Sequence, residues 1–252
     1  MDINLIGFDV TLGSRKPENI IDKDAACPFC DRENLTGILD TDGDIILLKN
    51  KYNVIKGADQ FVIIEGRNCH ADMPDYPPEH MHRLIRFGLR HWKELIRSGK
   101  YRAVLFFKNF GPMSGGTIRH PHMQLVGIPE VNPALLFSPR EFEGIPIQEE
   151  KGVIFNASTC PRVGFGELNI LPGPQGDPDT LADFIQIAVG YLMGHFNKRC
   201  NSYNIFFYHD EGRYYVKVMP RFATSPLFIG YNIHFLPNNL DRIVREIKEI
   251  YF

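Results

Sequence analysis

Apolar residues recur at helical spacing in three segments of the chain. The segment 77–99 carries such a stripe, which includes Met81 and Ile85, and it begins with two prolines, as helices often do. A second stripe runs through 179–196, and a third fits 239–251. We therefore expect three amphipathic helices, each with one face buried.

Shorter runs rich in β-branched and aromatic residues predict strands between these helices. The segment 35–50 reads as a hairpin, because Asp42-Gly43 is a favourable turn between two apolar runs. Further strands are expected at 61–65, 102–107, 122–128, 166–172, 203–208 and 214–219.

The two halves of the chain repeat one order of elements. In each half, a strand leads to a helix and then to two more strands, although the match is one of pattern more than of identity. This order predicts an α+β fold with two similar lobes, 1–140 and 150–252, each an antiparallel sheet with a packed helix. The segment 138–152 is expected to be the linker between them.

Composition and charge exclude several classes of protein. The 252 residues are 44% hydrophobic and 23% charged, with a net charge of −2, so the basic footprint of a nucleic-acid-binding protein is absent from the sequence. No apolar run has the length of a membrane span, and the first residues lack a signal-peptide pattern. Five cysteines, an odd number, argue against a disulfide framework. A reduced, cytoplasmic protein is the expectation.

The segment Phe107–Gly127 concentrates the chemistry of the chain. Alternate side chains of a strand share a face, so His122 and Gln124 are expected on one side and Met123 in the core. The preceding Gly-rich loop, 111–117, offers backbone N–H groups that suit a phosphate. A His-x-His pair or a Gly-Gly loop alone is usually structural, but their combination is far more specific.

These residues support covalent catalysis at phosphorus. A neutral His122 can attack a phosphorus atom, and a covalent intermediate divides one difficult displacement into two easier ones. Gln124 can donate N–H groups to the charged oxygens but cannot supply a proton. The leaving group is therefore expected to be an already acidic phosphate.

The run NFGPMSGGTIRHPHMQ resembles the active-site signature of the galactose-1-phosphate uridylyltransferase family, a branch of the histidine-triad superfamily that also holds dinucleotide polyphosphate phosphorylases. The resemblance implies that His122 becomes nucleotidylated and that Gln124 contacts the phosphates. It implies further contacts to phosphate or nucleoside from Asn109, Ser114, Gly115, Gly116, Thr117, Asn50, Tyr52 and Arg15.

The motif Cys27-Pro-Phe-Cys30 has the spacing of a zinc knuckle, which needs two more ligands. The resemblance supplies them from His70 and His120, which completes a closed Cys₂His₂ site for one structural zinc ion per chain. Such a zinc ion would brace the loop that carries the nucleophile. Cys69 is the main competitor of His70, and a redox role for the Cys-x-x-Cys motif is the other alternative.

Other histidines and the second half carry no comparable motif. His80, His82 and His91 are expected on the solvent-exposed side of their helix. Where the first half has HPHMQ, the second has YYVKVM, which offers no equivalent nucleophile. One active site per chain is expected, with the second half as scaffold.

The resemblance weakens where the family reads its sugar. Gly230 and Tyr231 fit the family pattern, but Pro226 stands where a basic residue is expected and Asn232 where an acidic one is expected. Loss of polar partners at such a site shifts specificity, so the reaction type is carried over and galactose is not.

The expected enzyme moves UMP or AMP from a nucleotide-sugar or a dinucleotide to a phosphate-bearing acceptor. The alternatives left open are a phosphorylase or hydrolase of the same superfamily, a nucleotide sensor without turnover and a zinc-braced interaction protein. Members of the family are often dimers, so the resemblance includes a homodimer among the expected partners. Nucleic-acid and membrane partners are not expected.

Overall fold

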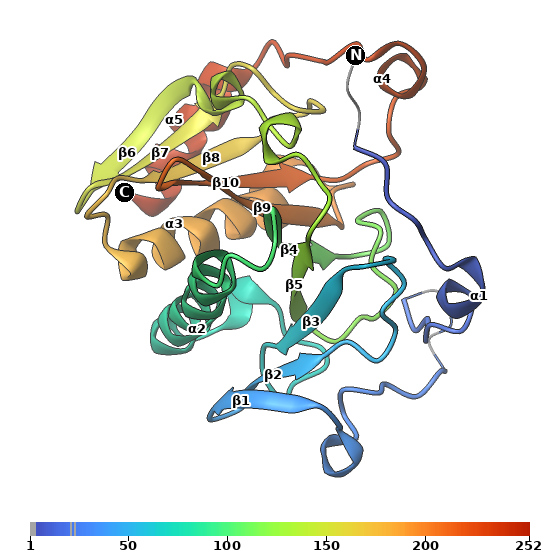
Figure 1. Cartoon of the computed structure of the whole chain (residues 1–252). Coiled ribbons are helices and arrows are strands. Elements are labelled where there is room, and N and C mark those ends of the chain that lie inside the picture. Colours follow the sequence, from blue (N-terminus) through green and yellow to red (C-terminus); the bar gives the residue numbers. More distant parts are fainter. Residues whose placement is uncertain (1–3, 21, 23) are drawn as a thin grey trace.

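One antiparallel sheet of ten strands organises the chain in the computed structural model, which describes residues 4–20, 22 and 24–252 (Figure 1). The strand order is β1-β2-β3-β5-β4-β9-β10-β8-β7-β6. The strands are β1 Ile38–Asp42, β2 Ile45–Lys49, β3 Asp59–Ile64, β4 Ala103–Phe110, β5 His122–Ile128, β6 Gly144–Glu150, β7 Val153–Ser158, β8 Leu168–Pro172, β9 Tyr203–Asp210 and β10 Arg213–Pro220.

The helices lie before, between and after these strands. The α-helices are α1 Val10–Gly13, α2 Pro78–Arg97, α3 Pro178–Tyr191, α4 Pro226–Tyr231 and α5 Leu240–Tyr251. Short helical turns are η1 Arg32–Asn34, η2 Met73–Asp75, η3 Pro133–Leu135, η4 Pro139–Phe142 and η5 Leu192–Phe196, the last of π type. No helix in the described part of the chain is long and apolar enough to span a bilayer.

The strand order shows the expected internal repeat. The first five strands follow the order 1-2-3-5-4, and the last five follow the same order in mirror sequence. The halves meet where β4 pairs with β9, with Phe107 opposite Phe206 and Asn109 opposite Asn204. The α+β architecture is therefore confirmed, and the two lobes share one continuous sheet.

Helices α2 and α3 lie side by side on one face of the sheet (Figure 1). Their apolar stripes are buried, as their periodicity predicted; Trp92 of α2 and Phe184 of α3 are inaccessible or nearly so. Trp92 also donates from its indole N–H to the carbonyl of Val104, at 2.8 Å. Burial of each such side chain contributes about 1.5–3 kcal/mol. This face is fully occupied by core packing, which leaves the opposite face for a ligand.

The three histidines of α2 are half-buried and hydrogen-bonded, so the expectation of a solvated surface is wrong. Nε2 of His82 lies 2.6 Å from a carboxylate oxygen of Asp183 on α3, and Nε2 of His91 lies 2.9 Å from Asp40 on β1. His80 contacts a main-chain carbonyl at 2.8 Å. These side chains tie α2 to its neighbours.

The expected linker at 138–152 is mostly regular structure. It contains η4 and then β6, which pairs with β7 through a tight turn. Lys151 and Gly152 have φ values of 44° and 75°, the pair of positive angles that a type I′ hairpin turn requires. The charged run QEEK obscured this hairpin, because those side chains lie on an edge strand that is open to water.

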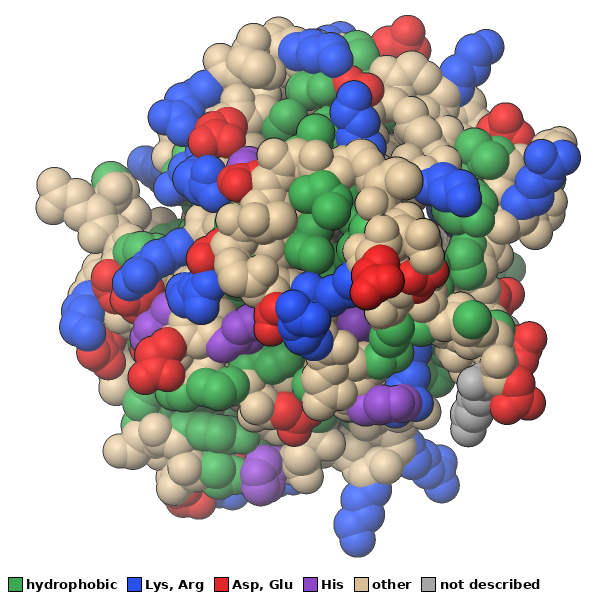
Figure 2. Space-filling view, turned by 90° about the horizontal axis from the view of Figure 1, so that it is seen from below, with side chains coloured by type: hydrophobic (Ala, Val, Ile, Leu, Met, Phe, Trp, Pro, Cys, Tyr) green, Lys and Arg blue, Asp and Glu red, His purple; other side chains and the backbone are tan. Residues whose placement is uncertain are grey.

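Charge is evenly mixed over the face of the molecule drawn in Figure 2. There, Lys and Arg side chains lie among Asp and Glu side chains. This mixture agrees with the net charge of −2 and with the expectation of a small-molecule ligand.

Candidate active site

A cavity of about 680 Å³ opens on the sheet face opposite the helices. His122 and Gln124 of β5 line it, and so do Gly115, Gly116 and Thr117 of the loop after β4. Met123, between the two polar residues, is fully buried in the core beneath α2. The strand alternation thus places the side chains as the sequence predicted, and the volume is in the usual range for a small-molecule site.

The ring of His122 is held in one tautomer by its own strand. Its Nδ1 lies 2.8 Å from the carbonyl oxygen of His120. A carbonyl oxygen can only accept, so Nδ1 carries the proton and the lone pair of Nε2 is left uncommitted. Burial, with a smaller contribution from the charge of Lys108, lowers the pKa of His122 to about 4. The imidazole is therefore neutral near pH 7, as a nucleophile must be.

Hydrogen-bond donors converge on the same space. Asn109 accepts from the amide of Asn204 through its own Oδ1, at 2.7 Å, and it lines the cavity, so its N–H₂ group remains to donate to a ligand. Gln124 lines the cavity two residues from His122 on the same face of β5. Fixed amide donors beside a nucleophile are the arrangement that stabilises charge on transferring phosphoryl oxygens.

The loop between β4 and β5 keeps its shape through glycine. Gly111 has a φ of 83°, and a Cβ there would lie 2.2 Å from the carbonyl oxygen of Asn201, so no other residue fits. Ser114 donates from Oγ to the Gly111 carbonyl, at 2.7 Å, and lines the neighbouring cavity rather than that of His122. Ser114 therefore holds the shape of the loop without lining the cavity of His122.

The expected nucleoside contacts divide into two groups. Asn50 and Tyr52 line the cavity, and the side chain of Asn50 accepts from the backbone N–H of Tyr52 at 2.9 Å. Arg15 does not line it: its side chain is exposed after the short helix α1, and its neighbour Lys16 lines the cavity instead. The basic residue that this N-terminal segment presents to the site is thus Lys16.

Four potential metal ligands cluster next to the nucleophile. Ligand atoms of Cys27, Cys30, Cys69 and His120 all lie within 4.8 Å of one another. His70 is not among them, because its side chain is exposed while its backbone N–H bonds to Asn68. Adjacent residues on this turn point in different directions, so the structure replaces His70 with Cys69 in the set.

The cluster has the chemistry of a tetrahedral metal site. Nε2 of His120 donates to the carbonyl of Gly66 at 2.9 Å, which directs the Nδ1 lone pair at the sulfurs of Cys27 and Cys30, 3.6 and 3.5 Å away. Burial and the neighbouring cysteines raise the pKa of Cys69 to about 12, so the thiolate is unfavourable there. A bound dication would stabilise the thiolate. The donor set therefore fits a metal such as zinc.

Phe29 connects this cluster to the nucleophile. It belongs to the Cys-Pro-Phe-Cys motif, and its ring packs edge-on against both His120 and His122, at centroid distances of 5.9 and 5.4 Å. Fixing the two cysteines therefore also fixes the surface against which His122 rests.

Two polar residues of the second half reach the site and were not expected from the sequence. Asn204 of β9 donates to Asn109, and Arg221 donates from Nη1 to Oδ1 of Asn204 at 2.7 Å. Alternation along YNIFFY puts Asn204 on the face opposite Tyr203 and Ile205. This alternation was the one sequence feature that pointed to Asn204. Its proximity to Asn109 depends on the β4–β9 pairing, which no local pattern specifies.

Comparison with known families places the chain. Residues 8–131 match the N-terminal domain of unknown function DUF4931, and residues 135–252 match its C-terminal domain. The chain belongs to the DUF4931 family. A crystal structure of a DUF4931 family protein from Bacillus cereus is 39% identical, with a TM-score of 0.76, and the match covers 84% of this chain and 98% of that one.

More distant structures share the DUF4931 fold. A GalT-like protein from Arabidopsis thaliana is 16% identical with a TM-score of 0.72, covering 90% of this chain and 92% of its own. An ADP-glucose phosphorylase from the same plant, with bound ADP-glucose, is 16% identical with a TM-score of 0.69, covering 95% and 94%. No curated protein matches the sequence. The resemblance to the galactose-1-phosphate uridylyltransferase-like fold is confirmed.

Proposed function

We propose that this DUF4931 protein is a nucleotidyltransferase that carries a nucleoside monophosphate on Nε2 of His122. The observation that supports this most strongly is the hydrogen bond from Nδ1 of His122 to the His120 carbonyl, which leaves a neutral Nε2 facing a cavity. The fold shared with a GalT-like protein and with an ADP-glucose phosphorylase supports a reaction of the nucleotidyltransferase or phosphorylase class.

The transfer takes two displacements. In the first, the Nε2 lone pair of His122 forms a bond to the α-phosphorus of the donor, and the bond from that phosphorus to the bridging oxygen breaks. The electron pair leaves with a phosphate that needs no added proton, so Gln124 and Asn109 have only charge to stabilise. In the second, a phosphate oxygen of the acceptor attacks, and the electron pair of the N–P bond returns to Nε2.

The donor class follows from the same argument. The polar side chains that β4 and β5 place in the cavity of His122 are the amides of Asn109 and Gln124, which cannot protonate a leaving group, so we infer a donor with a phosphate leaving group: a nucleotide-sugar or a dinucleotide. Asn50 and Tyr52 would contact the nucleoside, with UMP or AMP as the transferred group. The loop Gly115–Thr117 would hold the phosphates.

The metal site serves the nucleophile from outside the reaction. We infer that Cys27, Cys30, Cys69 and His120 hold one zinc ion, which would keep the loop rigid and take no part in the bond changes. We also infer that residues 1–140 form the catalytic lobe, which carries the nucleophile, and that residues 150–252 form a second lobe without one, which supports the first and adds Asn204 and Arg221 to the wall beside it.

Steady-state kinetics test the two-step route. Initial rates are measured over a grid of donor and acceptor concentrations, with UDP-glucose, ADP-glucose and diadenosine polyphosphates as donors. We expect parallel double-reciprocal lines for the wild type and for the exposed control His195→Ala. His122→Ala should show no turnover. Intersecting lines with a preparation that turns over would contradict the covalent route. Donor consumption without acceptor would instead identify a hydrolase.

A further inference from the structure

A second cavity, of about 710 Å³, adjoins the cavity of His122. The two share Leu105, Phe107 and Asn109 of β4 as a common wall, and Ser114 closes the second one beside the phosphate loop. A ligand in the second cavity would therefore approach the reacting phosphates from the side opposite to the donor nucleoside.

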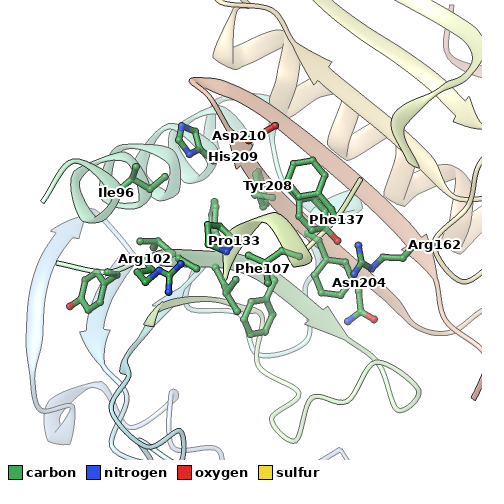
Figure 3. A pocket seen from close by; sticks show the side chains of 18 of the residues that line it. Ile96, Arg102, Phe107, Pro133, Phe137, Arg162, Asn204, Tyr208, His209 and Asp210 are labelled. Atoms are coloured by element: carbon green, nitrogen blue, oxygen red, sulfur yellow. The ribbon is translucent and has the colours of Figure 1, made fainter. Parts of the chain in front are cut away.

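The body of this second cavity is aromatic. Phe206 and Tyr208 of β9 line it together with Phe107, and Phe137 from the segment after β5 covers it. In Figure 3, Phe107 and Phe137 lie between Arg102 at one end and Arg162 at the other. Such walls favour stacking with a flat ring. A hexose matches these walls less well, because each hydroxyl that is buried against an aromatic ring without a partner costs about 1–3 kcal/mol.

One end of the cavity carries cationic and amide groups. Arg162 and Asn204 lie there (Figure 3), and Arg221 lines the same cavity and donates to Asn204. Arg162 is already paired with Glu141 at 2.8 Å. Arg221 is half-buried, and its side-chain partners in the described chain, Asn204 and Thr224, are uncharged. Its charge is thus available to an anion.

The charge of Arg221 is connected to the reaction centre by amides. Arg221 donates to Oδ1 of Asn204, and Asn204 donates to Oδ1 of Asn109, both at 2.7 Å. These two hydrogen bonds fix the guanidinium next to Asn109, which lines the same cavity as His122. Because Arg221 is half-buried, its guanidinium is less solvated than that of a surface arginine, and this burial lowers its pKa. A bound phosphate would offset the lost solvation.

We propose that the second cavity is the site of the phosphorylated reactant, namely the phosphate compound that leaves the donor in the first step and then the different one that enters as acceptor in the second. This reactant carries an aromatic ring, as a nucleoside phosphate does, and Arg221 binds its phosphate. The proposal rests on the function proposed for His122. In the second step, a phosphate oxygen of this reactant forms the new bond to phosphorus as the bond to Nε2 breaks.

Photo-crosslinking tests the location without requiring turnover. The full-length protein is irradiated with 8-azido-ADP, and labelled peptides are mapped by mass spectrometry. We expect label on peptides that contain Phe137 or Phe206, competed by ADP and not by galactose 1-phosphate. Arg221→Met should weaken this label roughly 10–100-fold, the loss expected for a charge-assisted contact.

Matched variants separate a lost contact from a lost fold. Arg221→Lys keeps the charge and should retain most of the label, and Arg102→Met, at the far end of the same cavity, should leave it unchanged. Label confined to peptides near Tyr52 would overturn the proposal, as would equal losses in Arg221→Met and Arg102→Met.

Discharge of the nucleotidylated enzyme tests the role in catalysis. The isolated adduct is mixed with ADP or with galactose 1-phosphate, and the loss of adduct mass is followed. Faster discharge by ADP, slowed by Phe206→Leu, supports the inference, and faster discharge by galactose 1-phosphate contradicts it. If no adduct forms with any donor, the proposed function fails, while the crosslinking result still decides what the cavity binds.

Discussion

The two halves of the sheet share one strand order and use the same face differently. In the first half, the face opposite the helices is left open over β5, where His122 and Gln124 line a cavity. In the second half, η4 covers that face over β10, and Lys217 is fully buried beneath it. The repeat thus accounts for the scaffold, and the uncovered face accounts for the chemistry.

The contrast extends to hydrogen bonding. Nζ of Lys217 lies 2.7 Å from both Oδ1 of Asn169 and the carbonyl of Glu141, and 3.1 Å from a carboxylate oxygen of Glu167. These polar groups satisfy one another. In the first half, Nε2 of His122 and the amide donors beside it have no such partner within the described chain. Unused donors and acceptors at a cavity indicate a ligand, whereas a closed network indicates structure.

The largest expected effect is the difference in transfer rate between a variant at the open face of β5 and one at the covered face of β10. His122→Ala removes the nucleophile and should lower transfer on the order of 10⁴-fold or more, as losses of catalytic nucleophiles do. Tyr215→Phe, on the covered face of β10, should leave the rate within a factor of about two, because its hydroxyl has no role in the reaction. Both rates are measured per folded molecule. A large loss in Tyr215→Phe would show that the covered face of β10 takes part in the chemistry.

Lys217→Met should cost stability instead of chemistry. It leaves Glu167 buried without its cation, and breaking such a buried pair costs about 3–5 kcal/mol. Denaturant unfolding measures this change, and transfer by the folded fraction should persist. A stable Lys217→Met variant that has lost activity would refute the view that the covered face of β10 is only a scaffold.

Gln124→Ala should reduce the transfer rate more than donor binding. Removal of one such donor typically costs about 10²–10³-fold in kcat. The adduct on His122 should still form, but slowly, and single-turnover mass spectrometry can time it. An unchanged kcat with a raised KM would mean that Gln124 binds the ground state and the transition state equally.

Variants of the adjacent residues Cys69 and His70 test which of them is the fourth metal ligand. Cys69→Ser should weaken metal binding by at least the roughly 10–100-fold that outer contacts cost, while His70→Ala should keep one equivalent of zinc. Metal content after dialysis against a weak chelator measures both. Zinc retained by Cys69→Ser and lost by His70→Ala would restore the Cys₂His₂ set.

Local patterns predicted the elements that depend on periodicity. The alternation through His122 and Met123 placed one side chain in the cavity and the other in the core, and the helical stripes marked α2, α3 and α5. These features depend on neighbours within a few residues, which the sequence displays directly.

Features that depend on tertiary contacts were not predictable in this way. The choice of Cys69 over His70 depends on how one turn is directed toward His120. Asn204 reaches Asn109 through strand pairing across 95 positions. The hairpin of β6 and β7 was hidden by the charged side chains of β6, its edge strand. The cavity is lined by Lys16 and not by its neighbour Arg15, because adjacent side chains of that segment point in different directions.

The most direct test of the central claim is the intact mass of the protein after mixing with nucleotide-sugars and dinucleotides without acceptor. The account predicts a gain equal to one nucleoside monophosphate, absent in His122→Ala, which also identifies the base. Zinc-loaded, folded protein that turns a donor over while its mass never changes would contradict a covalent intermediate on His122.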